Sequence, residues 1–333
     1  MDQSLTLSEF DAALKMVDID PAPAAEKAEM LMEIAMGMQT RPKSPEQLEH
    51  AALLYRRALA ICPAEQVLLH ARITIRLGTC LQAQPQGAAA ALKEARGHYE
   101  SALPVLQQHG RAEEVAETEL NLGLVFQALA ADGAARLHDA IQCYHRALRT
   151  FTRERYPQEY AILHNNLAVA YLSIPLSDEH GKMREALAVQ SFEAVLSVIG
   201  LVDHPSEYAM IQNNLGNALQ YAASGHPLEN NLRALEAYDE ALKVRNARDT
   251  PLEYANTIAN KANVLRSLPD VADAPPGGSN LQQAQALYRE ARQIFQRYGQ
   301  FSGMAAVDET LRDIASELQQ APPPGARYAA DAL

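Results

Sequence analysis

The chain has 333 residues, of which 48% are apolar and 6% aromatic; it has no tryptophan, and its formal net charge is −12. Basic residues form no Lys/Arg-rich block, so the sequence lacks the electrostatic footprint of a nucleic-acid-binding protein and predicts no nucleic-acid partner. No apolar run is long enough to span a bilayer, so we expect no membrane partner, and three widely spaced cysteines fit the reducing cytoplasm, where we expect the protein to reside.

Residues 1–20 are predicted to form a short helical lead-in, in which Thr6 and Glu9 can make a capping box before an apolar stripe. A repeat array is expected over 21–299, then a capping helix at 300–319 and a flexible, proline-rich tail at 320–333. The six units of the array are expected at about 24–63, 64–110, 111–156, 157–204, 205–250 and 251–299.

Each unit is expected to hold two helices, a first (A) helix and a second (B) helix. The A helices are expected at about 24–38, 65–83, 112–130, 157–173, 206–223 and 252–267. The B helices are expected at about 45–61, 89–107, 135–152, 182–199, 228–245 and 280–297. In every B helix an aromatic residue follows an alanine by four positions, and these aromatic residues are Tyr55, Tyr99, Tyr144, Phe192, Tyr238 and Tyr288.

Each A helix from the second unit onward carries a small residue at a fixed register: Gly78, Gly123, Ala168, Gly216 and Ala262. Glycine inside a helix costs up to about 1 kcal/mol relative to alanine, so its recurrence predicts a close approach of two helix backbones. A bulky residue follows three positions later and is expected to fill the adjoining gap. Large and small residues therefore alternate, which predicts that successive units interlock.

The spacing of small and aromatic residues resembles the tetratricopeptide repeat. Gly216, Ala234, Tyr238 and Ala241 match the small–small–aromatic–small positions of that repeat, and six registers agree. The period of 44 to 50 residues exceeds the usual length of about 34, and the tryptophan often found early in the repeat is absent. The resemblance implies an all-α fold, a right-handed superhelical solenoid of antiparallel helix pairs.

Three segments are similar to a long-period subtype found in the kinesin light chain and in bacterial arrays. They read YPQEYAILHNNLAVAY, HPSEYAMIQNNLGNAL and TPLEYANTIANKANVL, and they share Pro-x-Glu-Tyr-Ala before an asparagine-rich stretch. The resemblance implies that the A helices line a concave groove that binds peptides or segments of partner proteins. We therefore expect a protein or peptide partner.

Asparagine is a mediocre helix former, so its abundance in the A helices needs another explanation. On the register of the small residues, Asn165, Asn213, Asn217, Asn256 and Asn263 fall on the groove-lining stripe, where each amide can both donate to and accept from a peptide bond. Tyr221 and Arg266 share the stripe and complete the predicted partner-binding set. Alternatively, the asparagines form a ladder between stacked units, the role we expect for Asn166, Asn214 and Asn260.

The sequence contains no metal-ligand spacing, phosphate-binding loop or catalytic constellation, so we expect no enzyme, metal or cofactor. The predicted function is a non-catalytic adaptor or assembly chaperone; the alternative is a sensor whose superhelix tightens on a peptide or small ligand. A ligand bound through its C-terminal carboxylate stays open. The oligomeric state also stays open, because Phe295, Leu311 and Ile314 can pair two molecules or pack beneath a cap.

Three A-to-B linkers, at 173–181, 222–230 and 268–280, are expected to emerge on one edge of the array. Insertions on one edge of a solenoid often carry binding contacts. The longest linker can fold over the groove or act as a mobile spacer.

Overall fold

The computed structural model describes residues 10, 14, 15, 17, 19–40, 42, 45–84, 88–174, 181–222, 226–269 and 279–320. The capping box at Thr6 and Glu9, the tail at 321–333 and parts of the three A-to-B linkers (175–180, 223–225 and 270–278) lie outside these residues. Of the lead-in, Val17 is buried and the ring of Phe10 stacks on His50, with 4.8 Å between the ring centroids.

All regular structure in the described residues is helical, as the repeat pattern predicts. The helices of the first half are α2 (Ala24–Thr40), α3 (Pro45–Ile61), α4 (Val67–Gln82), α5 (Ala88–His109), α6 (Ala112–Ala131), α7 (Leu137–Ala147) and α8 (Pro157–Ser173). Those of the second half are α9 (Gly181–Leu196), α10 (Pro205–Tyr221), α11 (Pro227–Leu242), α12 (Pro251–Ser267), α13 (Asn280–Arg297) and α14 (Phe301–Gln320). Within the described helices, none is long and apolar enough to cross a bilayer.

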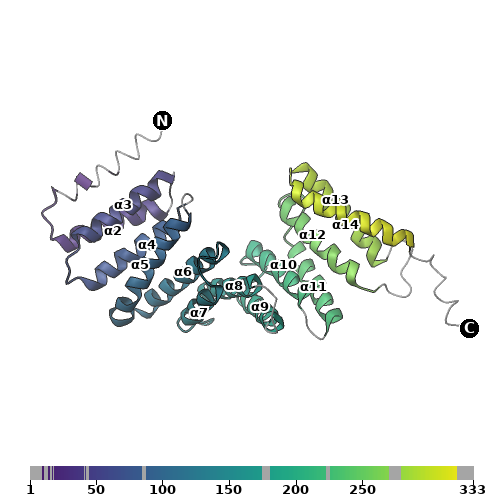
Figure 1. The fold of residues 1–333 in the computed structure, drawn as a ribbon, viewed down its shortest axis with the longest axis horizontal. Helices are drawn as coiled ribbons and strands as arrows, with labels where there is room; N and C mark the ends of the chain where they lie inside the picture. Colours follow the sequence, from purple (N-terminus) through teal and green to yellow (C-terminus); the bar gives the residue numbers. More distant parts are fainter. Residues whose placement is uncertain are drawn as a thin grey trace, which may run out of the picture. The chain divides into compact units, whose positions relative to one another are not determined.

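The chain forms two compact units, Met1–Ile174 and Pro175–Leu333. Within the first unit, the pairs α2/α3, α4/α5 and α6/α7 pack side by side and α8 follows them (Figure 1). Within the second unit, α9 packs on α10, the pairs α10/α11 and α12/α13 follow, and α14 covers the last pair. Val307 and Ile314 of α14 are buried in the same apolar cluster as Tyr288 and Phe295, so α14 occupies the capping position that the sequence indicates.

Three B helices end earlier than the sequence predicts. The expected ends were at 152, 199 and 245, whereas α7, α9 and α11 end at Ala147, Leu196 and Leu242. Beyond these ends the backbone makes 3₁₀-type hydrogen bonds between residues three apart. One example is the N–H of Thr150, which donates to the carbonyl of Ala147 at 3.0 Å. A turn then leads to a proline that opens the next A helix, where its fixed φ suits the first helical position.

The small residues of the A helices make room for an aromatic ring rather than for another backbone. A Cβ atom built on Gly123 would lie 2.4 Å from the ring of Tyr144, and one on Gly216 would lie 2.6 Å from the ring of Tyr238. At Gly78 the corresponding distance to Tyr99 is 3.0 Å. The predicted approach of two backbones is therefore wrong in detail: the closest neighbour of each glycine is the side chain of the paired B helix.

Hydrogen bonds hold the buried tyrosine of the B helix to its partner A helix. In four pairs the hydroxyl donates to a glutamine Oε1 four positions after the small residue: Tyr55 to Gln39 (2.8 Å), Tyr99 to Gln82 (3.0 Å), Tyr144 to Gln127 (2.9 Å) and Tyr238 to Gln220 (3.2 Å). The ring is buried while its hydroxyl is satisfied at the end of the A helix, which a buried polar group requires. The fourth pair has Phe192, without a hydroxyl, and Leu172 in place of the glutamine.

Candidate functional site: the A-helix face of the second unit

Six of the seven predicted partner-binding residues lie in the second unit, on α10 and α12. Their neighbourhood is completed by α14, because Arg266 of α12 forms ion pairs with Asp313 and Glu317 of that helix. We call this surface the A-helix face of the second unit. Its members are Met210, Asn213, Asn217, Gln220, Tyr221, Asn256, Asn263, Arg266, Asp313 and Glu317.

The most exposed part of the A-helix face combines an aromatic ring with amide groups. Tyr221, at the last turn of α10, is 65% exposed, and Asn256 on α12 is also exposed. The Nδ2 atom of Asn263 donates to the Tyr221 hydroxyl at 3.4 Å, which links α12 to α10. Met210 adds an exposed apolar side chain on α10. A ligand crossing from α10 to α12 would meet an apolar ring flanked by amide donors and acceptors.

Two asparagines of the predicted set are engaged inside the unit. Asn213 is 9% exposed, and its Oδ1 atom lies 3.5 Å from the Nδ2 atom of Asn260 on α12. The Oδ1 atom of Asn217 accepts a hydrogen bond of 2.7 Å from the Tyr238 hydroxyl. These oxygens therefore hold helices together, and for Asn217 only the NH₂ group is left to meet a ligand.

Asn165 belongs to the first unit, on α8, so the structure does not bring it together with the other six residues. Its Oδ1 atom is buried and has no hydrogen-bond partner among the described residues. The same holds for the Nδ1 atom of the adjacent His164, whose ring lies 4.3 Å from that of Tyr160. Burial, with a further contribution from His145, lowers the pKa of His164. Asn166 and Asn214 are half-buried, on α8 and α10.

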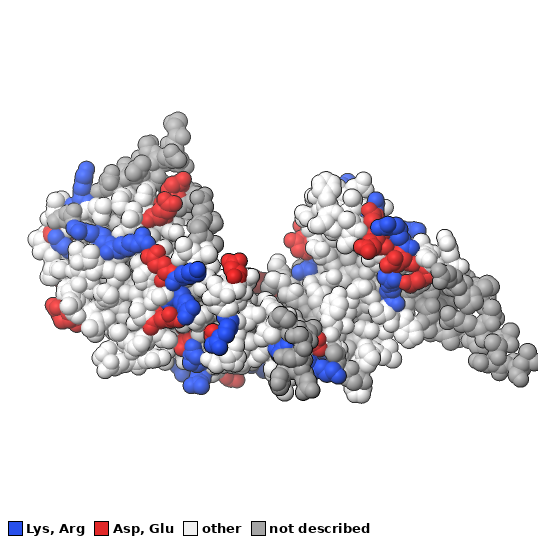
Figure 2. Space-filling model, viewed as in Figure 1, with Lys and Arg blue, Asp and Glu red and all other residues white. Residues whose placement is uncertain are grey.

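The cation of the A-helix face is already paired. Both α14 carboxylates approach the Arg266 guanidinium, and the hydrogen bond that Arg266 donates to Glu317 raises the pKa of Arg266. Lys261, the nearest other cation on α12, pairs with Asp239 of α11. Figure 2 shows red and blue side chains gathered together over α14. The face therefore offers no cation that is free to hold a ligand's carboxylate.

His, Cys and acidic side chains are scattered over the described residues. They include no group of three or more His, Cys, Asp or Glu side chains that could hold a metal ion. Burial raises the pKa of Cys80 to about 11 and that of Cys143 to about 12, so both thiols stay protonated and unreactive at neutral pH. His145, which meets the Tyr171 hydroxyl at 3.0 Å, has its pKa lowered by burial. These groups are packed in the first unit as structural side chains.

A hollow of about 370 Å³ lies between α9, α10 and α11, away from the A-helix face. Its lining mixes the apolar Val189 and Leu219 with Glu185 and Asn230, and an ion pair between Arg233 and Glu193 joins two of its walls. The hollow is partly open to solvent and does not gather donors or acceptors of one kind. It is a gap between neighbouring B helices.

Sequence reasoning missed two features of this unit. One is the pairing of Arg266 with α14, which the i, i+4 spacing of Asp313 and Glu317 in the last helix could have indicated. The other is the tyrosine–glutamine bond, whose signal is a glutamine four positions after the small residue in four of the five pairs with a tyrosine ring; in the pair with Tyr288 that position is Arg266. Both interactions can be predicted from sequence spacing only once it is known which helices pack against each other.

No protein-family model and no curated protein matches the sequence. A solved structure described as the assembly chaperone of RpL4 (Acl4) is similar with a TM-score of 0.55 at 13% identity, over 88% of this chain and 99% of that one. At this identity the likeness shows the fold alone.

Two further structures are similar only at low TM-scores. The TPR2AB-domain complex of yeast Sti1 with pHSP90 has a TM-score of 0.30 at 13% identity, over 87% of this chain and 99% of that one. A Rap protein complexed with Competence and Sporulation Factor has 0.25 at 13% identity, over 96% and 99%. These two scores are too low to support an argument. The helix pairs, their small and aromatic packing positions and the likeness at 0.55 together identify the fold as that of a tetratricopeptide-type array.

Proposed function

We propose that the protein is a non-catalytic adaptor or assembly chaperone that holds an extended segment of a partner protein on the A-helix face of the second unit. The observation that carries the proposal is the exposed Tyr221 ring in contact with the Asn263 amide, with the exposed amide of Asn256 two turns earlier on α12. Aromatic rings supply contact area, and amides can pair with the donors and acceptors of a peptide backbone.

The strength of this binding can be bounded from the groups available. Each hydrogen bond to an amide contributes roughly 0.5–1.5 kcal/mol net, and a large ring adds apolar burial. Binding also has to offset the loss of freedom of the partner segment. We therefore expect a reversible complex with a dissociation constant on the order of micromolar.

The test uses two exposed residues of the A-helix face, of which Tyr221 makes one long contact between helices, the 3.4 Å bond from Asn263. Tyr221→Ala combined with Asn256→Ala removes the ring and an exposed amide while leaving Asn213 and Asn217 in their internal contacts. The matched control is Leu228→Ala with Leu232→Ala, two exposed side chains of α11 on the other layer of the unit. Affinity capture from cell extract with quantitative mass spectrometry compares both variants with the natural chain.

We expect the face variant to lose its specific partners, with helical content and unfolding midpoint unchanged, and the control to keep them. Brief proteolysis of the captured complex should leave one short protected partner peptide, because an extended segment is shielded only where it is held. Equal capture by the two variants would contradict the proposal. Thermal stabilisation by the low-molecular-weight fraction alone would instead favour a ligand sensor.

A further inference from the structure

The charges bordering the A-helix face are unequal. On the α14 side, Asp313 and Glu317 are 59% and 44% exposed, and Glu309 stands exposed one turn before Asp313. Glu309 has no ion-pair partner within the part of the chain that the structure describes. The three carboxylates are spaced four residues apart, so they run along one side of the helix. Arg266 is the one cation of the A-helix face that lies next to these carboxylates.

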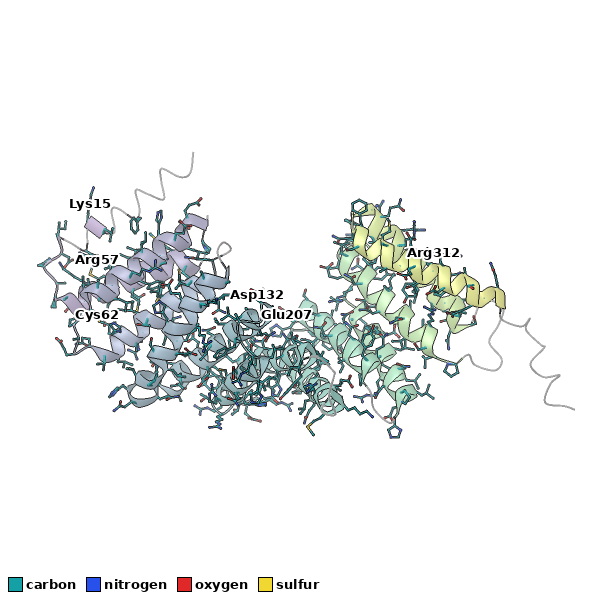
Figure 3. All side chains as sticks on the ribbon, viewed as in Figure 1. Lys15, Arg57, Cys62, Asp132, Glu207 and Arg312 are labelled. Carbon is teal, nitrogen blue, oxygen red and sulfur yellow. The ribbon has the colours of Figure 1, made fainter. Side chains whose placement is uncertain are left out.

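The other cations of this region are directed elsewhere. Arg312 of α14, labelled in Figure 3, donates from Nε to the backbone carbonyl of Asp308 at 3.3 Å. Asp308 itself pairs with Arg292 of α13, and Arg312 follows Asp308 by one turn, so both lie nearer the side of α14 that faces the B helix than do Asp313 and Glu317. Lys261 is held by Asp239 of α11. The border of the A-helix face at α14 therefore carries two negative charges in excess.

Arg266 has a fixed role in this arrangement. Its side chain is 27% exposed and is shared between two carboxylates, so a ligand carboxylate would have to displace Glu317 and would meet repulsion from Asp313 and Glu309. A lysine or arginine of a ligand would meet the opposite situation, because it could approach exposed carboxylates without breaking an ion pair.

Resting on the proposed function, we propose that the segment held on the A-helix face is cationic and internal to its chain. A Lys or Arg of the segment meets Glu309, Asp313 and Glu317 at the α14 end, while its backbone crosses the amides of α12 and α10. A chain-terminal carboxylate is selected against. The asymmetry of charge at α14 is what distinguishes these two kinds of segment.

The experiment uses the full chain and synthetic random libraries of 12-residue peptides. One library is immobilised through its N-terminus, leaving the carboxylate free, and one through its C-terminus. We expect selected peptides to be enriched in Lys and Arg, to come equally from both libraries, and to depend on Tyr221 and Asn256. A selected peptide whose Lys is replaced by Glu should bind at least tenfold more weakly at low salt, and the difference should shrink as ionic strength rises.

Two variants locate the charge effect. Glu309→Gln with Asp313→Asn removes two carboxylates but keeps Glu317 on Arg266, and it should weaken the basic peptide about fivefold to tenfold. Glu229→Gln with Glu236→Gln removes the same charge from α11 and should change the affinity less than twofold. Equal losses in both variants would overturn the inference, because they would report net charge alone.

The outcomes separate the inference from the function on which it rests. Acidic or neutral peptides that depend on Tyr221 and Asn256, or peptides that need their free carboxylate, would overturn the inference and leave the proposed function standing. Selected peptides that bind the Tyr221→Ala/Asn256→Ala variant as well as the natural chain would overturn both.

Discussion

The two units build the same helix pairs but present different side chains at matched positions of their A helices. Three positions before and one position after the small residue, the first unit has Met32 and Met36 on α2 and Leu120 and Leu124 on α6. The second unit has at those positions Asn213 and Asn217 on α10, and Ala259 and Asn263 on α12. Because both units have the same small and aromatic packing residues, packing does not require the side chains at these two positions to differ. The difference shows that one scaffold carries aliphatic side chains there on α2 and α6 and mostly amides on α10 and α12, while α8 of the first unit has Asn165 at the matched position.

The contacts between successive A helices differ in the same way. In the first unit, Arg72 of α4 pairs with Glu114 of α6 at 2.7 Å, and Arg76 pairs with Glu117 at 3.5 Å. In the second unit, α10 and α12 are linked by the Asn260–Asn213 and Asn263–Tyr221 contacts of 3.5 and 3.4 Å, at the long end of hydrogen bonding. The amides of Asn260 and Asn263 are thus weakly engaged and can exchange these contacts for those of a ligand, whereas Asn217 is held by its 2.7 Å bond from Tyr238.

The largest expected effect of a single change is at Arg146 of the first unit. This residue makes two hydrogen bonds, of 2.6 and 2.7 Å, to Glu119, whose side chain is only 2% exposed. Arg146→Ala strands a buried carboxylate and should lower the free energy of unfolding by about 3 kcal/mol. Arg233→Ala in the second unit breaks a pair exposed on both sides and should cost about 1 kcal/mol or less. Urea unfolding followed by circular dichroism measures both, and equal losses would contradict the distinction.

Next in size are substitutions at the glycines beneath the tyrosine rings. Gly123→Ala and Gly216→Ala force a methyl group to within 2.4 and 2.6 Å of a ring, an overpacking that costs about 1–3 kcal/mol and outweighs the better helix propensity of alanine. Gly78→Ala, at 3.0 Å, should be close to neutral because these two terms offset each other. Thermal unfolding midpoints should therefore fall for the first two and stay within a few degrees for the third. If all three substitutions changed the unfolding midpoint equally, contact with the tyrosine ring would not be the cause of the destabilisation.

A smaller effect is expected at the tyrosine hydroxyls. Tyr238→Phe removes hydrogen bonds to Asn217 and Gln220 and should cost about 1 kcal/mol, since the amide oxygens remain close to solvent. Adding Gln220→Leu reproduces the Phe192 and Leu172 combination of the fourth pair and should recover part of the loss. A double-mutant cycle in urea gives the coupling. Strict additivity of the two changes would argue against the pairing.

The smallest effect is a pH dependence confined to the first unit. Burial lowers the pKa of both His145 and His164, so the unfolded chain binds these protons more readily than the folded one. Stability is therefore complete above the ordinary histidine pKa of about 6.5 and falls as the pH drops below it. Hydrogen exchange of 137–173 should be faster at pH 5.5 than at pH 7.5 after correction for the intrinsic rate. His164→Gln should reduce this difference, and an unchanged difference would assign it to other groups.

The sequence predicted the helices well because each repeat carries its own packing signal. The alanines around Tyr55 and Tyr238 are fully buried, and the bulky residues Leu81 and Leu219 fill the gaps expected of them. The ends of the B helices were missed because the change from α-helical to 3₁₀-type hydrogen bonds after Ala147 is not signalled by the residue types. Local pattern determines where a helix packs better than where it stops.

The candidate site was less accessible to sequence reasoning. Register placed Tyr221 and Asn256 on an exposed face, but it could not separate them from Asn217, whose oxygen is used by Tyr238. Adjacent positions on a helix differ by about 100° in direction, so a small error in register moves a side chain from solvent to an internal contact. Arg266 could be assigned to Glu317 only once α14 had been placed against α12.

The most direct measurement of the central claim is site-specific photo-crosslinking of the full chain in cell extract. The photoreactive residue p-benzoylphenylalanine replaces Tyr221 on the A-helix face, Leu232 on α11 or Leu124 in the first unit, one position at a time. The account predicts a discrete crosslinked partner at 221, mapped by mass spectrometry to one short segment, and background yield at 232 and 124. Crosslinking at 232 or 124 with none at 221 would contradict it.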